Sequence, residues 1–172
     1  MSLLDASALP RMLTVSQGFP QSTPLEIPAS VAEQISLVQD RLTPGTRVAL
    51  TVGSRGIANI KEIVLAVLGE LKAAGVEPFI VPAMGSHGGA TPEGQKRILA
   101  DYGITEQTMG VPIEAAMETR EIGCTQNGIP AFTSSAALSA DGIVLLNRVK
   151  PHTDYFSRTI GSGLIKMMVV GM

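Results

Sequence analysis

The fold follows from one stretch, Arg47-Val48-Ala49-Leu50-Thr51-Val52, which leads directly into the turn Gly53-Ser54-Arg55-Gly56. A short, β-branched and mostly apolar run is typical of a strand that is buried on both faces of a parallel sheet. After the turn, Asn59 stands where it could cap a helix, and apolar residues then recur with the helical period from Ile60 to Leu71, before Gly75 ends the helix. This segment therefore predicts a strand, a turn and a helix in succession.

The same order recurs further along the chain. We expect a strand at residues 78–82, a glycine-rich turn at residues 85–90, and a helix to about Tyr102 with Thr91 as its cap and Pro92 in its first position. Another buried strand is expected at residues 142–147. Strands that alternate with helices favour an α/β fold, with a mostly parallel sheet and helices on both faces in a Rossmann-like three-layer arrangement.

The remaining segments carry weaker patterns. Residues 1–27 are proline-rich, with a short strand candidate at residues 12–15, and are expected to form an N-terminal arm. Residues 28–172 are expected to form the α/β domain. Its first helix is predicted to open at a capping box, Ser30-Val31-Ala32-Glu33, and to run to about Leu42. Minor strands are expected at residues 121–124 and 130–132, and a short helix at residues 134–138.

Composition excludes several classes of protein. The chain has 172 residues, of which 16% are charged and 45% hydrophobic, as expected for one compact domain. A net charge of -2, 3% aromatic residues and no Trp argue against nucleic-acid binding. We see no signal peptide and no apolar run of membrane-spanning length, so a cytoplasmic location is expected. Cys124 is the single cysteine, which excludes an internal disulfide and a cysteine-pair zinc site.

Unusual polar residues follow three of the predicted strands. Arg55 follows the first, His87 the second, and Lys150 and His152 follow the last, together with Asn147. Ligands of open α/β sheets bind beyond the carboxyl ends of the strands, so these side chains are expected to face one pocket. Arginine offers a planar fork for a carboxylate or phosphate, and histidine exchanges protons near neutral pH. The pattern fits a small acid as the ligand.

Lys166 stands alone in an apolar run, residues 164–170. A cation in such a run is costly unless it is paired or chemically used. Each site candidate also has a structural interpretation. Lys166 could extend its amine out to water, and Arg55 could be a surface residue. His87 and His152 could be structural side chains, since Pro151 stiffens the turn before His152 without implying chemistry.

Four motifs in order carry a resemblance to a known family. The motifs are Gly53-Ser54-Arg55-Gly56-Ile57-Ala58-Asn59, Gly85-Ser86-His87-Gly88-Gly89-Ala90-Thr91, Lys150-Pro151-His152-Thr153-Asp154 and Gly163-Leu164-Ile165-Lys166-Met167. From about Arg47 to its end, the chain resembles the N-terminal domain of the nickel-dependent lactate racemase family. It looks closer to the uncharacterised branches of that family than to the lactate enzyme itself.

The resemblance implies a cofactor and residue roles. In that family a pyridinium nucleotide holds nickel in a sulfur-carbon-sulfur pincer and is tethered through a thioamide to a lysine, which Lys166 matches by position. His87 and His152 match the general acid and base, and Arg55 matches the arginine that grips the substrate. The implied activity is racemisation or epimerisation of a small 2-hydroxy acid by proton-coupled hydride transfer. The enzymes that build the cofactor are implied as partners.

The chain departs from the lactate enzyme in three ways. The spacing from His152 to Lys166 is longer, and Val52 stands where an acidic residue precedes the arginine. The histidine that ligates nickel in the family lies after the tethering lysine, so its counterpart is expected beyond Met172. We therefore expect a truncated domain of a larger two-domain protein. A fragment lacking the second domain is expected to be inactive and to lack the cofactor.

Two other function classes stay open. One is a non-catalytic α/β module that binds a phosphate or nucleotide through its glycine-rich turns and helix N-termini. The other is a scaffold domain whose apolar C-terminal run serves as an assembly surface. Proton carriers are needed only by the racemase, so substitution of His87 separates these classes.

Overall fold

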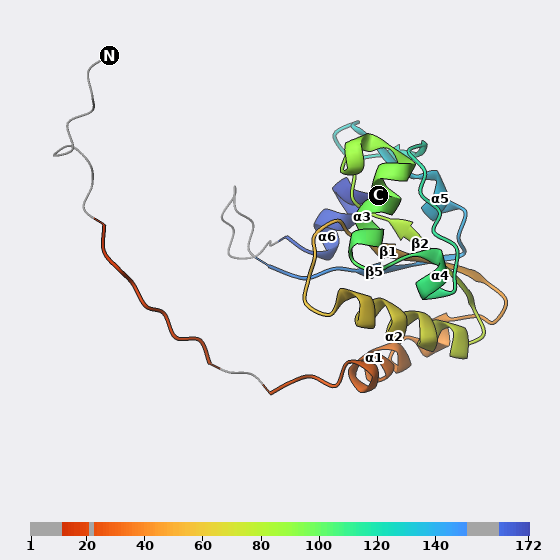
Figure 1. The fold of residues 1–172 in the computed structure, drawn as a ribbon. Helices are drawn as coiled ribbons and strands as arrows, with labels where there is room; N and C mark the ends of the chain where they lie inside the picture. Colours follow the sequence, from red (N-terminus) through yellow and green to blue (C-terminus); the bar gives the residue numbers. More distant parts are fainter. Residues whose placement is uncertain (1–11, 21–22, 151–161) are drawn as a thin grey trace, which may run out of the picture.

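The computed structural model describes residues 12–20, 23–150 and 162–172. Its centre is a three-stranded parallel sheet in the order β2-β1-β5 (Figure 1). β1 is Arg47–Val52, β2 is Glu77–Pro82 and β5 is Gly142–Leu146. Val52 lies opposite both Pro82 and Leu146, so the three strands end level with one another. The carboxyl ends therefore form a single edge, from which three loops leave side by side.

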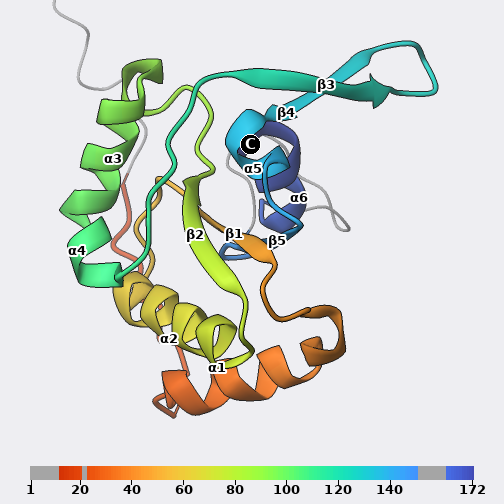
Figure 2. The same cartoon turned by 90° about the vertical axis from the view of Figure 1, so that its right-hand side faces the viewer.

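Helices cover both faces of this sheet (Figure 2). Three of them, α2 (Ile60–Ala73), α3 (Pro92–Asp101) and α4 (Glu106–Met109), lie on the face to which β1 contributes Val48, Leu50 and Val52. On the other face lie α5 (Ser135–Leu138) and the C-terminal α6 (Leu164–Lys166), which continues as the π-helical turn η4 (Met167–Gly171). The expected α/β fold, with a parallel sheet and helices on both faces, is confirmed.

The alternation of strand side chains explains this layering. Successive side chains of a strand point to opposite faces, so Ala49 packs against Phe79 and α5 while Leu50 packs against α2. Leu50, Leu68 and Phe79 are all at least 98% buried. Burial of each such side chain contributes roughly 1.5–3 kcal/mol to the free energy of unfolding.

β5 differs from the strand that was expected at residues 142–147. It was predicted to be buried, but its residues are only partly covered, and Ile143 is 41% exposed. The reason is its place at the edge of the sheet, where β1 is its one strand neighbour among the described residues. Apolar composition alone does not distinguish an edge strand from a central one.

The helix ends are partly as the sequence predicts. Thr91 caps α3, with its hydroxyl accepting a hydrogen bond from the Gly94 N–H, and Gly75 follows α2 with a φ of +80°. Asn59 occupies the N-cap position of α2 but its side chain makes no cap hydrogen bond. The capping box at Ser30 is wrong. α1 spans Ile27–Ser36 and begins earlier because Pro28 occupies its first turn, and the 3-10 turn η2 (Gln39–Arg41) follows it.

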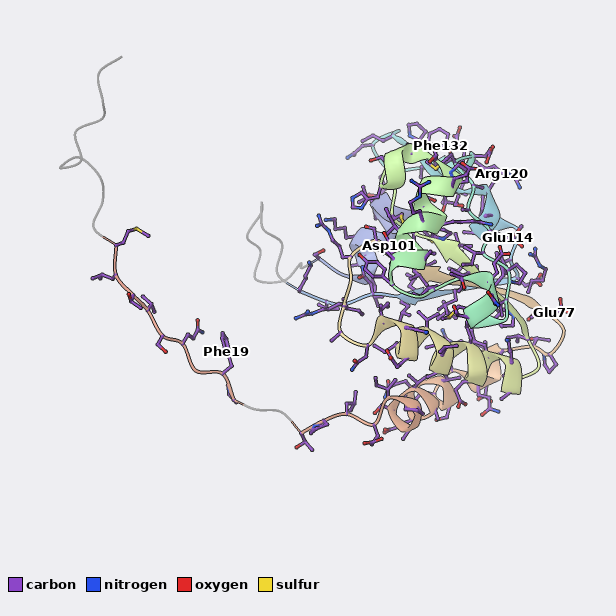
Figure 3. All side chains as sticks on the ribbon, in the orientation of Figure 1. Phe19, Glu77, Asp101, Glu114, Arg120 and Phe132 are labelled. Carbon is purple, nitrogen blue, oxygen red and sulfur yellow. The ribbon has the colours of Figure 1, made fainter. Side chains whose placement is uncertain are left out.

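The strand candidate at residues 12–15 is also wrong. Residues 12–20 contain neither helix nor strand, and the side chains of Met12 and Leu13 are 89% and 86% exposed. Figure 3 shows Phe19 on this segment, away from the helices and strands. An apolar run becomes a strand only when a neighbouring strand pairs with it, and the described residues provide none here.

The weakly patterned middle of the chain forms a hairpin. β3 (Thr119–Cys124) and β4 (Pro130–Ser134) pair in antiparallel fashion and extend from the body of the domain (Figure 2). These strands and α5, which is capped by the Ser134 hydroxyl, confirm the elements expected in this region. None of the helices in the described residues has the length and apolar character needed to cross a membrane.

Glu106 links three separate parts of the domain. Its carboxylate in α4 accepts a hydrogen bond from the Ile113 N–H and pairs with the Lys96 amine of α3, each at 3.1 Å. Ile113 in turn forms a parallel bridge to Ile80 of β2. The hydrogen bond from Ile113 and the charge of Lys96 hold the pKa of Glu106 below its usual value of 4.5. The ionised carboxylate therefore stabilises the folded chain.

We expect Glu106→Gln to lower the free energy of unfolding near neutral pH. A carboxyl whose pKa is depressed by folding contributes stability above its unfolded pKa, and this is lost as pH falls through the folded value. The difference between wild type and variant should therefore shrink from about pH 7 to about pH 3. Urea unfolding at both pH values measures it, with Glu33→Gln, an exposed carboxylate on α1, as control. A difference that grows on acidification would contradict this account.

Candidate functional site

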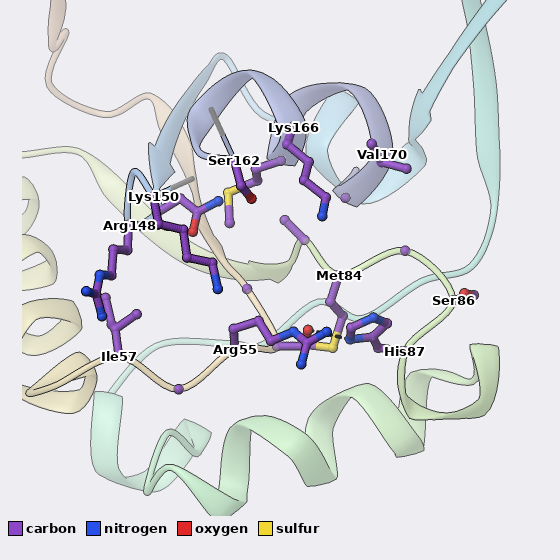
Figure 4. A pocket seen from close by; sticks show the side chains of 18 residues that line it. Arg55, Ile57, Met84, Ser86, His87, Arg148, Lys150, Ser162, Lys166 and Val170 are labelled. Carbon is purple, nitrogen blue, oxygen red and sulfur yellow. Dashed lines mark hydrogen bonds between the residues drawn. The ribbon is translucent and has the colours of Figure 1, made fainter. Parts of the chain in front are cut away.

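A cavity of about 300 Å³ lies at the carboxyl edge of the sheet (Figure 4). Its lining comes from the loops after β1, β2 and β5 and from the C-terminal helical segment. The chain passes from β1 to β2 on one side and later returns to β5 on the other side of β1. Such a reversal of strand order opens a crevice where ligands of open α/β sheets bind.

Arg55 lines this cavity from the turn after β1. The turn is held by Tyr102 at the end of α3. The Tyr102 hydroxyl donates to the Ser54 carbonyl at 2.8 Å and accepts from the Gly56 N–H at 3.1 Å. These two bonds fix the backbone on both sides of Arg55. The arginine side chain itself stays exposed to the cavity and available for an anion.

His87 lines the same cavity from the turn after β2. Its Nδ1 is hydrogen-bonded to the Ser54 hydroxyl at 2.5 Å, which joins the first two loops of the site. A hydroxyl can donate to an unprotonated ring nitrogen and accept from a protonated one. Ser54 therefore remains a partner for Nδ1 whichever state the ring adopts, and leaves Nε2 as the nitrogen for proton exchange.

The turn that carries His87 is anchored on α3. The buried amide of Gln95 donates to the Gly85 carbonyl at 2.8 Å, and the Thr91 hydroxyl donates to the Gly88 carbonyl at 3.0 Å. A Cβ on Gly94 would collide with the Gly88 carbonyl oxygen. Glycine is required at that position because helix and turn meet backbone to backbone. The anchoring gives His87 a defined backbone position.

Lys166 reaches the cavity from α6, pointing toward the side where Arg55 and His87 lie (Figure 4). The helical segment is docked through Met167, whose sulfur accepts from the Thr51 hydroxyl at 3.0 Å, and through the Gly171 carbonyl, which accepts from the Gly85 N–H at 3.1 Å. The apolar run at residues 164–170 is mostly exposed. Among them Met167 is buried, while Lys166 and its apolar neighbours are exposed.

His152 lies outside the described residues, so its role stays a prediction. Lys150 and Ser162, the described residues on either side of that segment, exchange two backbone hydrogen bonds of 2.8 Å. Both line the cavity. The described residues that flank His152 in the sequence therefore both lie at the cavity.

The cavity is strongly cationic. Its lining includes Arg55, Arg148, Lys150 and Lys166, and no Asp or Glu is among the described residues that line it. Arg148 and Tyr102 are the residues of this region that sequence reasoning missed. Arg148 could have been noticed as a second cation two positions before Lys150, whereas nothing in the sequence links Tyr102 to a turn that lies 48 residues away. A cavity with this charge favours anionic ligands.

Across the described ranges, no group of three or more His, Cys, Asp or Glu residues is placed to hold a metal ion. The expectation that the nickel ligand of the family lies beyond Met172 stays a prediction.

Comparison with known proteins identifies the family. The family model for the lactate racemase N-terminal domain matches residues 22–157, which is most of the chain. The chain belongs to the lactate racemase N-terminal domain family. No curated protein and no solved structure matches it.

Membership places most of the site inside the matched region. Residues 22–157 include Arg55, His87 and His152, whereas Lys166 lies beyond the end of the match. The match begins at residue 22, whereas the resemblance carried by the sequence motifs begins at about Arg47. The lactate racemase family points to an isomerase as the parent activity of this domain.

Proposed function

We propose that the protein of which this domain is part racemises or epimerises a small 2-hydroxy acid. The reaction would proceed by proton-coupled hydride transfer with a lysine-tethered nickel-pincer nucleotide. One observation carries the proposal. Arg55, His87 and Lys166 come from three segments far apart in the sequence and line a single cationic cavity. Arg55 would bind the carboxylate of the substrate, His87 would carry a proton, and Lys166 would supply the amine for covalent attachment of the cofactor.

The residues of the cavity fit such a cofactor. The Lys166 side chain is exposed and points into the cavity, as a covalent tether requires. The cations among the described lining residues suit a nucleotide phosphate. When bound, the pyridinium ring would accept a hydride from the substrate and return it. The proposed protein ligand of the nickel ion is the histidine that the family has after the tethering lysine.

The residues of the chain would bind the acid and move its proton. Arg55 would hold the carboxylate of the substrate through its planar fork. His87 would exchange the hydroxyl proton through Nε2 while Ser54 holds Nδ1. His152 is the proposed second proton carrier, acting on the opposite face of the hydroxyl-bearing carbon. A proton carrier on each face would let the product form with either handedness.

We further propose that residues 28–172 form the first domain of a longer protein and that a second domain closes over the cavity. Residues 1–27 would be an arm outside that domain. The enzymes that build the nucleotide would be required for activity. A cytoplasmic location belongs to the same proposal.

One observation favours a second candidate function. Glycine-rich turns follow both β1 and β2 and expose backbone near the cations of the cavity, as in modules that only bind a phosphate or nucleotide. In such a module His87 and His152 would have no chemical part.

Chiral chromatography of product acids separates the two functions. The full-length protein, produced with and without the cofactor-building enzymes, is incubated with each enantiomer of a panel of small 2-hydroxy acids. The racemase predicts convergence of both enantiomers to one mixture in the loaded sample alone. Enantiomers that stay pure, combined with saturable binding of inorganic phosphate to the unloaded protein, would instead support the binding module.

A further inference from the structure

The cavity holds more positive charge than one carboxylate requires. Arg55 alone can bind a carboxylate through two hydrogen bonds, yet Arg148 and Lys150 also line the cavity. Within the described part of the chain, no carboxylate forms an ion pair with any of these three side chains. Like charges gathered around one space repel each other until an anion enters. The positive charge beyond that of Arg55 therefore points to a ligand with more than one anionic group.

Arg148 and Lys150 form a group distinct from the Arg55 and His87 side of the cavity. Both follow β5, and Figure 4 shows Lys150 pointing toward the middle of the cavity and Arg148 on the side away from His87 in this view. His87 lies at the other end of the same view, with Arg55 between them. A ligand that reaches from His87 past Arg55 would meet this second cationic group.

The backbone under the second group is fixed. The Arg148 N–H donates to the side-chain oxygen of Asn147 at 2.8 Å, and the Asn147 amide donates to the Gly163 carbonyl at 3.0 Å. The Lys150 N–H donates to the Ser162 carbonyl at 2.8 Å. These bonds connect the loop after β5 to the start of the C-terminal helical segment. Arg148 and Lys150 therefore project from backbone that is fixed by hydrogen bonds.

We propose that the substrate is a dicarboxylic 2-hydroxy acid, whose distal carboxylate is bound by Arg148 and Lys150. Arg55 would hold the carboxylate next to the reacting carbon. This inference rests on the proposed racemase function and narrows its substrate class. The chemistry recognised is an anionic oxygen group, and a nucleotide phosphate is the other source of such a group. The experiment below separates the two sources.

The test compares 2-hydroxysuccinate with its 4-amide, which has the same size and lacks only the distal charge. With the loaded full-length protein, kcat/KM for racemisation should be about tenfold to a hundredfold higher for the diacid. Arg148→Gln/Lys150→Gln should bring the ratio of the two kcat/KM values to about one. The control Arg97→Gln removes an exposed cation on α3, outside the cavity, and should keep the preference.

A binding measurement makes the test independent of turnover. Calorimetric titration with succinate and with succinamate should show the same preference for the diacid, and the same loss in the double variant. Equal kcat/KM for diacid and amide would overturn the inference while leaving the racemase function standing. Absence of racemisation with a retained preference for succinate would overturn the racemase function alone. A double variant that loses nickel and nucleotide but keeps the diacid preference would assign the cations to the cofactor phosphate and overturn the inference.

Discussion

Replacing His87 by alanine should lower the rate of racemisation by the loaded full-length protein by about 10²–10⁴-fold, the usual contribution of general acid–base catalysis. The reason is the position of the ring at the cavity, where Ser54 occupies Nδ1 and leaves Nε2 to serve the substrate hydroxyl. Initial rates at saturating substrate, measured from each enantiomer, give the effect on kcat.

Binding and folding should survive this substitution. His87 is exposed, and its side chain forms no part of either core cluster, so nickel content and melting temperature should stay near those of the wild type. Gln107→Ala, an exposed position on α4, serves as the control for a distant truncation. A His87→Ala protein that retains more than about half of the wild-type kcat would exclude His87 as a proton carrier.

Replacing Lys166 by arginine should abolish attachment of the cofactor. Arginine keeps the positive charge and much of the length of lysine but lacks the primary amine that forms a thioamide. Intact mass of the full-length protein, produced with the cofactor-building enzymes, should lose the increment seen in the wild type. Nickel should fall from about one per chain to background, and racemisation should fall with it.

Lys150 offers a matched control because it is, with Lys166, one of the two lysines among the described residues that line the cavity. Lys150→Arg should keep the mass increment, and peptide mapping should place that increment on the peptide containing Lys166. An increment on Lys150, or one that persists in Lys166→Arg, would show that the proposed tether is on the wrong residue.

Local signals in the sequence were enough for the central elements of the fold. The apolar run at Arg47–Val52, the Thr91-Pro92 start of α3 and the stop at Gly75 depend on neighbours within a few residues, and the structure contains all three. The capping box at Ser30 failed because Pro28 provides a competing start one turn earlier. The partial exposure of β5 was missed because strand order is decided by contacts remote in sequence.

The candidate site was predictable to a similar extent. The general rule that parallel strands present their carboxyl ends at one edge was enough to expect Arg55 and His87 together, and the cavity also includes Lys166. The support around them was not predictable. Tyr102 and Ser54 act through hydrogen bonds that span 48 and 33 residues, and no pattern in the sequence indicates such pairs. His152 remains a prediction from sequence and resemblance.

The most direct test of the racemase mechanism is racemisation in deuterium oxide. The loaded full-length protein is incubated with a single enantiomer of its 2-hydroxy acid, and the product of opposite handedness is isolated and analysed by mass spectrometry. Transfer of the carbon-bound hydrogen as a hydride keeps it out of exchange with water. The product is therefore expected to carry protium at C2. Deuterium at C2 would show that the hydrogen leaves as a proton, and an acid that keeps its original handedness would contradict racemase activity altogether.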